Sequence, residues 1–154
     1  MIALKRILVP TDFSPTSEIA VKYARALAEA FGASLHLLHV LESPLLQNVA
    51  SEVYVPPPDF YEEWERAVRE RLDRVVPAAE RGTLALSCDV RTGSPFVEIV
   101  QFAREQDIDL IVLGTHGRGA VAHMFLGSVA ERVVRKAPCP VLTVRHPEHE
   151  FVQP

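Results

Sequence analysis

The sequence predicts one α/β domain, built as a doubly wound sheet of five parallel strands with helices on both faces. Short apolar runs of strand length alternate with segments of helical periodicity, the pattern of a parallel sheet with crossover helices. The chain has 154 residues, which suits a single domain of ordinary size. Its residues are 48% hydrophobic and 23% charged, the balance of a globular protein with a packed core.

The N-terminal third predicts a strand, a helix and a second strand. The first strand is Arg6–Pro10. Ser14 can cap a helix that carries Pro15 in its first turn, and Gly32 ends that helix. The apolar residues that recur at near-helical spacing along it are Ile19, Tyr23, Leu27 and Phe31. The second strand is Ser34–Leu41.

The middle of the chain predicts a long loop followed by a helix. The loop, residues 42–58, ends in three prolines, and loops of this length are often lids or partner sites. Asp59 and Glu62 have the spacing of a capping box. The buried face of the helix is expected at Trp64, Val68, Leu72 and Val75. Pro77 is expected to kink or end it.

The second half predicts three strands and two helices. The strands are residues 84–90, where alternate positions are apolar, residues 108–113, which close at Gly114, and Val141–Val144. The helices are one that opens at Ser94 and Pro95 and turns Ile99, Val100 and Ala103 inward, and one from about Ser128 to Lys136. The domain is expected to cover residues 1–146, with a polar tail at residues 147–154.

A glycine-rich segment follows the fourth predicted strand and leads into the last predicted helix. It reads Gly114-Thr115-His116-Gly117-Arg118-Gly119, and Gly127-Ser128 opens the helix. Glycine lets the backbone approach a ligand closely, and a helix N-terminus offers unpaired N–H groups and a positive dipole end. The segment therefore predicts a phosphate site, although glycines at strand ends are often only turn formers.

Open α/β sheets bind ligands at the carboxyl ends of their strands, where the strand order reverses. If the order is 3-2-1-4-5, Thr11 and Asp12 face the glycine-rich segment across that crevice. Asp12 is then placed to accept hydrogen bonds from ribose hydroxyls, and the backbone of Val40 to bind an adenine edge. Asp12 could instead merely cap the first helix together with Ser14.

Three motifs resemble those of the ATP-binding universal stress proteins, over residues 5–145. They are Val9-Pro10-Thr11-Asp12-Phe13-Ser14, Gly114-x2-Gly117-x9-Gly127-Ser128 and Ala137-Pro138-Cys139-Pro140-Val141-Leu142. The resemblance implies a five-stranded Rossmann-like fold, ATP or another adenine nucleotide with Mg²⁺, and a homodimer paired through Val141–Val144. The dimer agrees with an independent argument, because those four residues would otherwise form an exposed apolar edge.

Matched residue by residue, the resemblance also implies which residues surround the nucleotide. Adenine and ribose are expected near Thr11, Asp12, Val40 and Gly114, and the phosphates near Gly117, Gly127, Ser128 and Val129. Pro10, Leu113 and Arg118 complete the predicted site. The family often has Lys or Arg inside the nine-residue spacer, where this chain has Ala122-His123-Met124, so Arg118 is the candidate phosphate cation.

Charge and composition exclude several other classes of function. A net charge of -4 provides no basic field for nucleic acid or anionic lipid. We find no signal peptide and no apolar run near the roughly 20 residues that span a bilayer, so a cytoplasmic location is expected. Cys88 and Cys139 are read as buried reduced thiols. His36 and His39 face opposite sides of a strand and are read as structural, not metal-binding.

The sequence favours a regulatory nucleotide-binding protein, with an unidentified protein partner, over an enzyme. It has no Gly-x4-Gly-Lys-Ser/Thr loop and no supported nucleophile. Two alternatives stay open. One is a slow ATPase or phosphotransferase, with Asp12 helping to hold Mg²⁺ and Ser128 near the γ-phosphate. The other is a dimeric interaction module that has lost its nucleotide.

Overall fold

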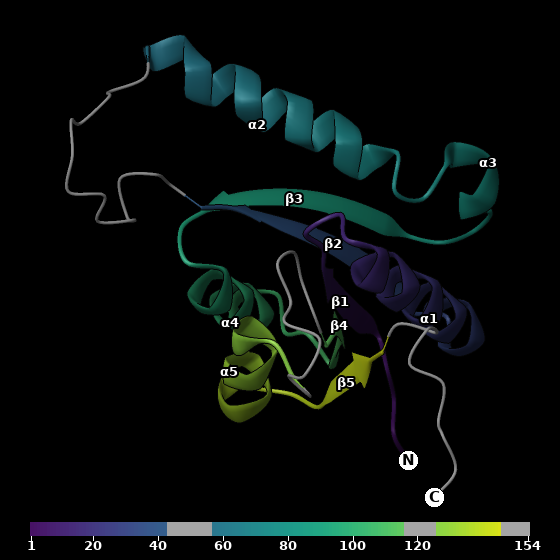
Figure 1. Cartoon of the computed structure of the whole chain (residues 1–154). Coiled ribbons are helices and arrows are strands. Elements are labelled where there is room, and N and C mark those ends of the chain that lie inside the picture. The colour runs from purple at the N-terminus through teal and green to yellow at the C-terminus, as the bar shows by residue number, and fades with distance from the viewer. Residues whose placement is uncertain (43–56, 116–125, 146–154) are drawn as a thin grey trace, which may run out of the picture.

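The computed structural model describes residues 1–42, 57–115 and 126–145. Its five strands are β1 (Arg6–Pro10), β2 (Ser34–Leu41), β3 (Leu86–Thr92), β4 (Leu110–Gly114) and β5 (Val141–Val144). They form one parallel sheet of order β3-β2-β1-β4-β5 (Figure 1), which confirms the predicted fold class and strand order. The helices are α1 (Pro15–Phe31), α2 (Pro58–Asp73), α3 (Ala78–Arg81), α4 (Pro95–Glu105) and α5 (Ser128–Lys136).

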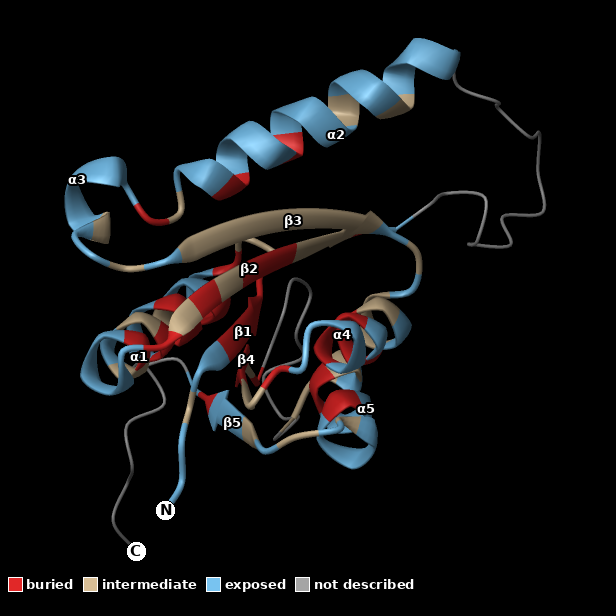
Figure 2. Cartoon of the chain, turned by 180° about the vertical axis from the view of Figure 1, so that it is seen from behind, coloured by how far each residue is buried: buried red, intermediate tan, exposed pale blue. Residues whose placement is uncertain are grey.

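Two helical layers cover the sheet, and each encloses its own hydrophobic core. Successive side chains of a strand point to opposite faces, so Ile7 and Val9 pack with α1 and the end of α2, whereas Leu8 packs with α4 and α5. β1, β2 and β4 carry most of the buried strand residues, and β3 is only half-buried (Figure 2). β1 therefore lies in the middle of the sheet, with its carboxyl end between those of β2 and β4.

Helix α1 begins and ends where the sequence predicts, but its buried face differs from the expected one. The Ser14 hydroxyl accepts a hydrogen bond from the Ser17 amide, and Gly32 ends the helix at φ 64°. The side chains packed against the sheet are mainly Ala20, Val21, Ala24 and Ala28. Tyr23 and Phe31 of the predicted apolar set are exposed, because the small alanines let the helix lie close to the strands.

Helix α2 corrects two further predictions. Its N-cap is Pro57, with no side-chain hydrogen bond, so the capping box predicted at Asp59 and Glu62 does not form. The helix ends at Asp73, before Val75, and Pro77 instead precedes the short α3. Val68 and Leu72 are buried as expected, whereas Trp64 is only half-buried. Most of α2 is exposed, with a narrow buried stripe facing the sheet (Figure 2).

The remaining elements follow the prediction with small shifts. β4 starts two residues later than predicted and includes Gly114, and α4 buries Ile99, Val100 and Ala103. The predicted long loop, apart from its ends, and the polar tail lie outside the described residues. Within the described part of the chain, no helix is both long and apolar enough to cross a bilayer.

Candidate functional site

The loop between β1 and α1 is held in one conformation by its own side chains. Thr11 continues β1, because its amide donates to the Leu38 carbonyl at 2.9 Å. The Thr11 hydroxyl accepts from the Phe13 amide, and Asp12 Oδ1 accepts from the Ser14 amide at 2.9 Å. These bonds keep Phe13 at φ 62°, a left-handed conformation that is unusual for an aromatic residue. The loop is thus shaped before any ligand arrives.

His39 supports the same loop from the neighbouring strand. Its Nδ1–H donates to the Thr11 carbonyl at 2.7 Å, and its ring stacks on Phe13 at 4.7 Å between centroids. The sequence predicted a structural histidine here, and this contact agrees with that prediction. What the sequence did not identify is the residue that His39 supports.

Gly114, at the end of β4, meets the first turn of α1 at very close range. A Cβ atom added there would lie 2.9 Å from Thr16 Cγ2 and 3.2 Å from the Thr16 backbone. Glycine at this position is therefore required by packing between β4 and α1, independently of any ligand.

Thr115, which was not among the predicted site residues, holds the start of α5 beside the end of β4. Its amide donates to the Val144 carbonyl, and its own carbonyl accepts from the Gly127 amide. Residues that are 12 apart in the sequence are thereby fixed side by side at the carboxyl edge. The one available signal was that Thr115 directly follows a buried strand.

Among residues 1–42, 57–115 and 126–145, no side chain caps the N-terminus of α5. Gly127 is the N-cap residue, with φ -64° and ψ 157°, and no side chain bonds to the first-turn amides in the described structure. Ser128 is exposed and Val129 half-buried, while Ala130 belongs to the core. The first amides of a helix lack intrahelical acceptors and lie at its positive dipole end, so this turn offers donors to an anion.

The apolar residues of the predicted site lie on one face of the sheet. Leu113 belongs to the core under α4 and α5, and Val40 and Val129 pack against that core. Pro10 is buried at the end of β1 and has the strand parity of Leu8, which points to the same face. These residues and the start of α5 share the α4/α5 side of the carboxyl edge.

Not every predicted site residue falls within the described structure. Gly117 and Arg118 lie outside it, as do Gly119 and His123. The nine others are described, and they belong to three places: the end of β1 and its loop, the ends of β2 and β4, and the first turn of α5. Extending the β1–β4 register places Thr11 level with Gly114.

The histidine and the two cysteines considered in the sequence are hydrogen-bonded or partly buried. His36 has a Ser hydroxyl near each ring nitrogen, Ser87 at 2.8 Å and Ser34 at 3.1 Å, and burial lowers its pKa. Cys88 and Cys139 are half-buried, less than predicted, and pack against different cores. Burial raises the pKa of both thiols, that of Cys88 to about 12. Among the described residues, no three His, Cys, Asp or Glu side chains are grouped to hold a metal.

Comparison with known sequences matches nearly the whole chain. A sequence model of the universal stress protein family matches residues 3–145. Universal stress protein MJ0531 of Methanocaldococcus jannaschii is 35% identical over 150 residues, covering 95% of this chain and 85% of that protein. A universal stress protein of Thermus aquaticus is 37% identical over 148 residues, covering 92% and 98% of the two chains.

Comparison with solved structures finds the same architecture. Protein MJ0577 of M. jannaschii superimposes with a TM-score of 0.75 at 30% identity, covering 94% of this chain and 98% of that one. A universal stress protein solved in complex with cAMP has a TM-score of 0.60 at 27% identity, covering 93% and 98%.

Proposed function

The chain belongs to the universal stress protein family, and we propose that it is a regulatory protein that binds an adenine nucleotide at the carboxyl edge of its sheet. One observation carries the proposal. The loop after β1 is preformed and carries the acidic Asp12, and the helix after β4 begins without a side-chain cap from the described residues. Both lie at the ends of neighbouring strands, where the strand order reverses. The cAMP complex of a relative at 27% identity supports the same class of ligand.

The parts of the nucleotide are assigned by chemistry. The phosphates bind the amides of Ser128 and Val129 and the Ser128 hydroxyl, because these are donors at a positive helix end. Gly127 contributes no side chain that would compete for those amides. Gly117 and Arg118 come from the segment that joins β4 to α5 and complete the phosphate site. We propose ATP, with Mg²⁺, as the nucleotide.

Asp12 is proposed to hold the ribose. An ionised carboxylate has about four acceptor positions, so Asp12 can accept from ribose hydroxyls as well as from the Ser14 amide. Adenine is proposed to lie near Val40 and Leu113, on the apolar part of the edge. Asp12 would then have both functions that the sequence left as alternatives, shaping the loop and binding the ligand.

Two substitutions of Asp12 separate these functions. Asp12→Asn keeps an oxygen for the Ser14 amide, so we expect unfolding stability within about 0.5 kcal/mol of wild type. It loses the charged acceptor, and ATP affinity should fall about tenfold or more. Asp12→Ala should lose both stability and affinity. Urea unfolding and calorimetric titration measure the two quantities, and wild-type ATP affinity in Asp12→Asn would refute the ribose assignment.

A further inference from the structure

A cavity lies on the α1/α2 side of the sheet, next to the β1–α1 loop. It measures about 340 Å³ and is enclosed by the β1–α1 loop, α1, the C-terminal end of α2 and α3. These elements gather at one end of the molecule (Figure 1). Its volume is at the small end of the range for ligand pockets, which suits a compact molecule.

The inner wall of the cavity is apolar. Val21 and Val76 are 5% and 1% exposed, and both belong to the core under α1 and α2. Phe13 and Val75 are half-buried beside them. An apolar group that settles here would cover the exposed parts of Phe13 and Val75 and release water from them, since Val21 and Val76 are already almost fully buried.

The rim of the cavity is basic, although the chain as a whole is acidic. Four cations, Lys22, Arg25, Arg71 and Arg74, line it together with Glu18 and Glu80. Arg25 is neutralised by ion pairs, at 2.5 Å to Glu80 and 3.3 Å to Glu29. Hydrogen bonding to Glu80 accordingly raises the pKa of Arg25.

The other three cations form no ion pairs with carboxylates among the described residues. Within the described residues, Lys22, Arg71 and Arg74 have no carboxylate within 4 Å, and Glu18 forms no ion pair with Lys22 one turn away. Arg71 lies with its guanidinium 4.1 Å from the centroid of the Phe13 ring. A cation–π contact of this kind keeps the guanidinium against the apolar wall rather than free in solvent.

We propose that this cavity is a binding site for a small organic anion with one carboxylate or phosphate group on a compact apolar body. The anionic group is bound by Arg71, Arg74 and Lys22, since guanidinium groups bind both kinds of oxyanion through paired N–H donors. The apolar body covers the exposed parts of Phe13 and Val75. The site adjoins the proposed nucleotide site at Thr11, which also lines the cavity, but its cations and apolar wall lie on the α1/α2 side of the sheet.

Four probes test the chemistry, each titrated into the full chain with amide-resolved NMR. They are benzoate, phenyl phosphate, neutral benzyl alcohol and inorganic phosphate. We expect the two amphipathic anions to bind and to shift the amides of Phe13, Val21 and Val76. Benzyl alcohol and inorganic phosphate should each bind at least about tenfold more weakly. Added salt should weaken binding of the anions, because the cations are exposed.

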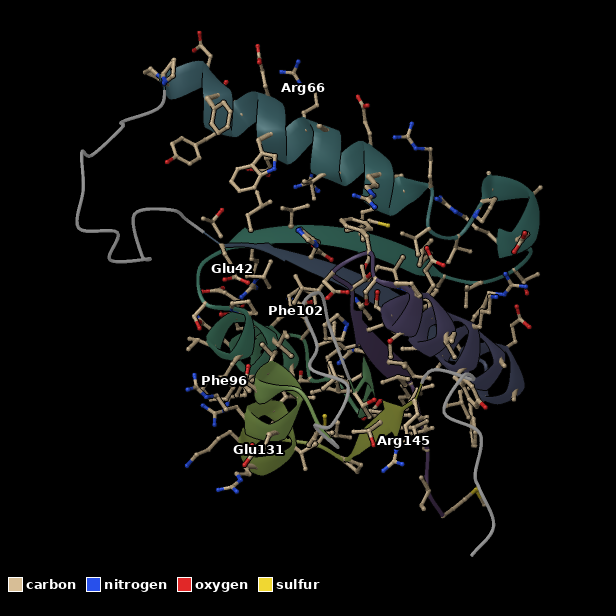
Figure 3. All side chains as sticks on the ribbon, in the orientation of Figure 1. Glu42, Arg66, Phe96, Phe102, Glu131 and Arg145 are labelled. Carbon is tan, nitrogen blue, oxygen red and sulfur yellow. The ribbon has the colours of Figure 1, made fainter. Side chains whose placement is uncertain are left out.

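Variants on one helix supply the matched control. Arg71→Gln combined with Arg74→Gln should weaken benzoate about tenfold or more. Arg66→Gln removes an arginine from the side of α2 that faces away from the sheet (Figure 3) and should leave benzoate affinity unchanged. Ser128→Asp, aimed at the nucleotide site, should also leave it unchanged. Thermal unfolding checks that each variant folds.

Three results would overturn the proposal. One is that neither amphipathic anion shifts the cavity amides at millimolar concentration. Another is an equal loss in the Arg71/Arg74 double variant and in Arg66→Gln, which would indicate a non-specific charge effect. The third is that inorganic phosphate binds as tightly as phenyl phosphate, which would exclude a contribution from the apolar wall. Loss of ATP binding alone would leave this proposal intact.

Discussion

At the scale of single residues, the carboxyl edge is shaped by short-range hydrogen bonds around Phe13. The Asp12 carboxylate, the Thr11 hydroxyl and His39 Nδ1 each bond to the backbone of the loop. A non-glycine residue at positive φ carries a conformational cost of the order of 1 kcal/mol, so the surrounding bonds must offset it. Strain of this kind is often found beside binding sites, which fits the position of Asp12.

Gly114 provides a prediction at this scale. Gly114→Ala should lower the free energy of unfolding by about 1–3 kcal/mol, because the new methyl would meet Thr16 in a tightly packed core. Thr16→Ser removes the nearest atom, Thr16 Cγ2, and should recover part of the loss in the Gly114→Ala background. Urea unfolding at constant pH measures both. A neutral Gly114→Ala variant would show that α1 and β4 separate easily.

At the scale of elements, the first turn of α5 lacks the stabilisation of a side-chain cap from the described residues, at the point where the ligand is proposed to bind. No side chain in the described part of the chain caps that turn, whereas Ser14 caps α1. A cap would stabilise α5 but would occupy the amides that an anion needs. Stability and binding are therefore expected to oppose each other at this turn.

Gly127→Asp tests that opposition. Without nucleotide, the variant should be more stable by roughly 0.5–1 kcal/mol, because a carboxylate caps the turn and favours its dipole. Its ATP affinity should fall at least about tenfold, since the same carboxylate repels phosphate. Gly127→Ser caps without charge and should lie between wild type and Gly127→Asp in affinity. If Gly127→Asp raised both the free energy of unfolding and the ATP affinity, or lowered both, helix capping and phosphate binding would not oppose each other at this turn.

Element boundaries could be predicted where a local signal sets them. Ser14, Gly32 and the Ser94-Pro95 pair marked helix ends correctly, because capping depends on residues close in sequence. The apolar pattern of α1 did not identify its whole buried face, since Tyr23 and Phe31 are exposed and close packing against β1 and β4 selects alanine. At α2, the conformation of Pro57 and Pro58 starts the helix before Asp59 can act as a cap.

At the scale of the whole molecule, the alternation of strands and helices predicted a parallel sheet, whereas the order 3-2-1-4-5 was a hypothesis that the alternation alone does not select. The site needed more. Both sides of the carboxyl edge could be named from the sequence, Asp12 on one and Gly127 on the other. The bond from the Gly127 amide to the Thr115 carbonyl could not, because it depends on three-dimensional closure of the β4–α5 connection and uses backbone atoms without a sequence signature. The same holds for the contact between Gly114 and Thr16.

The sheet order also bears on assembly. β5 is an edge strand, and its Leu142 is 38% exposed, so we propose that two chains pair through β5 in a homodimer. Leu142→Lys should convert the dimer to a monomer in sedimentation velocity, because the charge would be buried at the interface. Val97→Lys, on the exposed side of α4, is the control and should stay dimeric. A monomeric wild type, or a dimeric Leu142→Lys variant, would rule out this interface.

The proposed function depends above all on the binding of nucleotide phosphates at the start of α5. The most direct test is calorimetric titration of ATP, ADP, AMP and adenosine, with Mg²⁺, into protein freed of nucleotide by reversible unfolding. We expect submillimolar ATP binding and an affinity that decreases as phosphates are removed, with adenosine the weakest. Absence of binding to all four, or adenosine binding as tightly as ATP, would contradict a phosphate site at this helix.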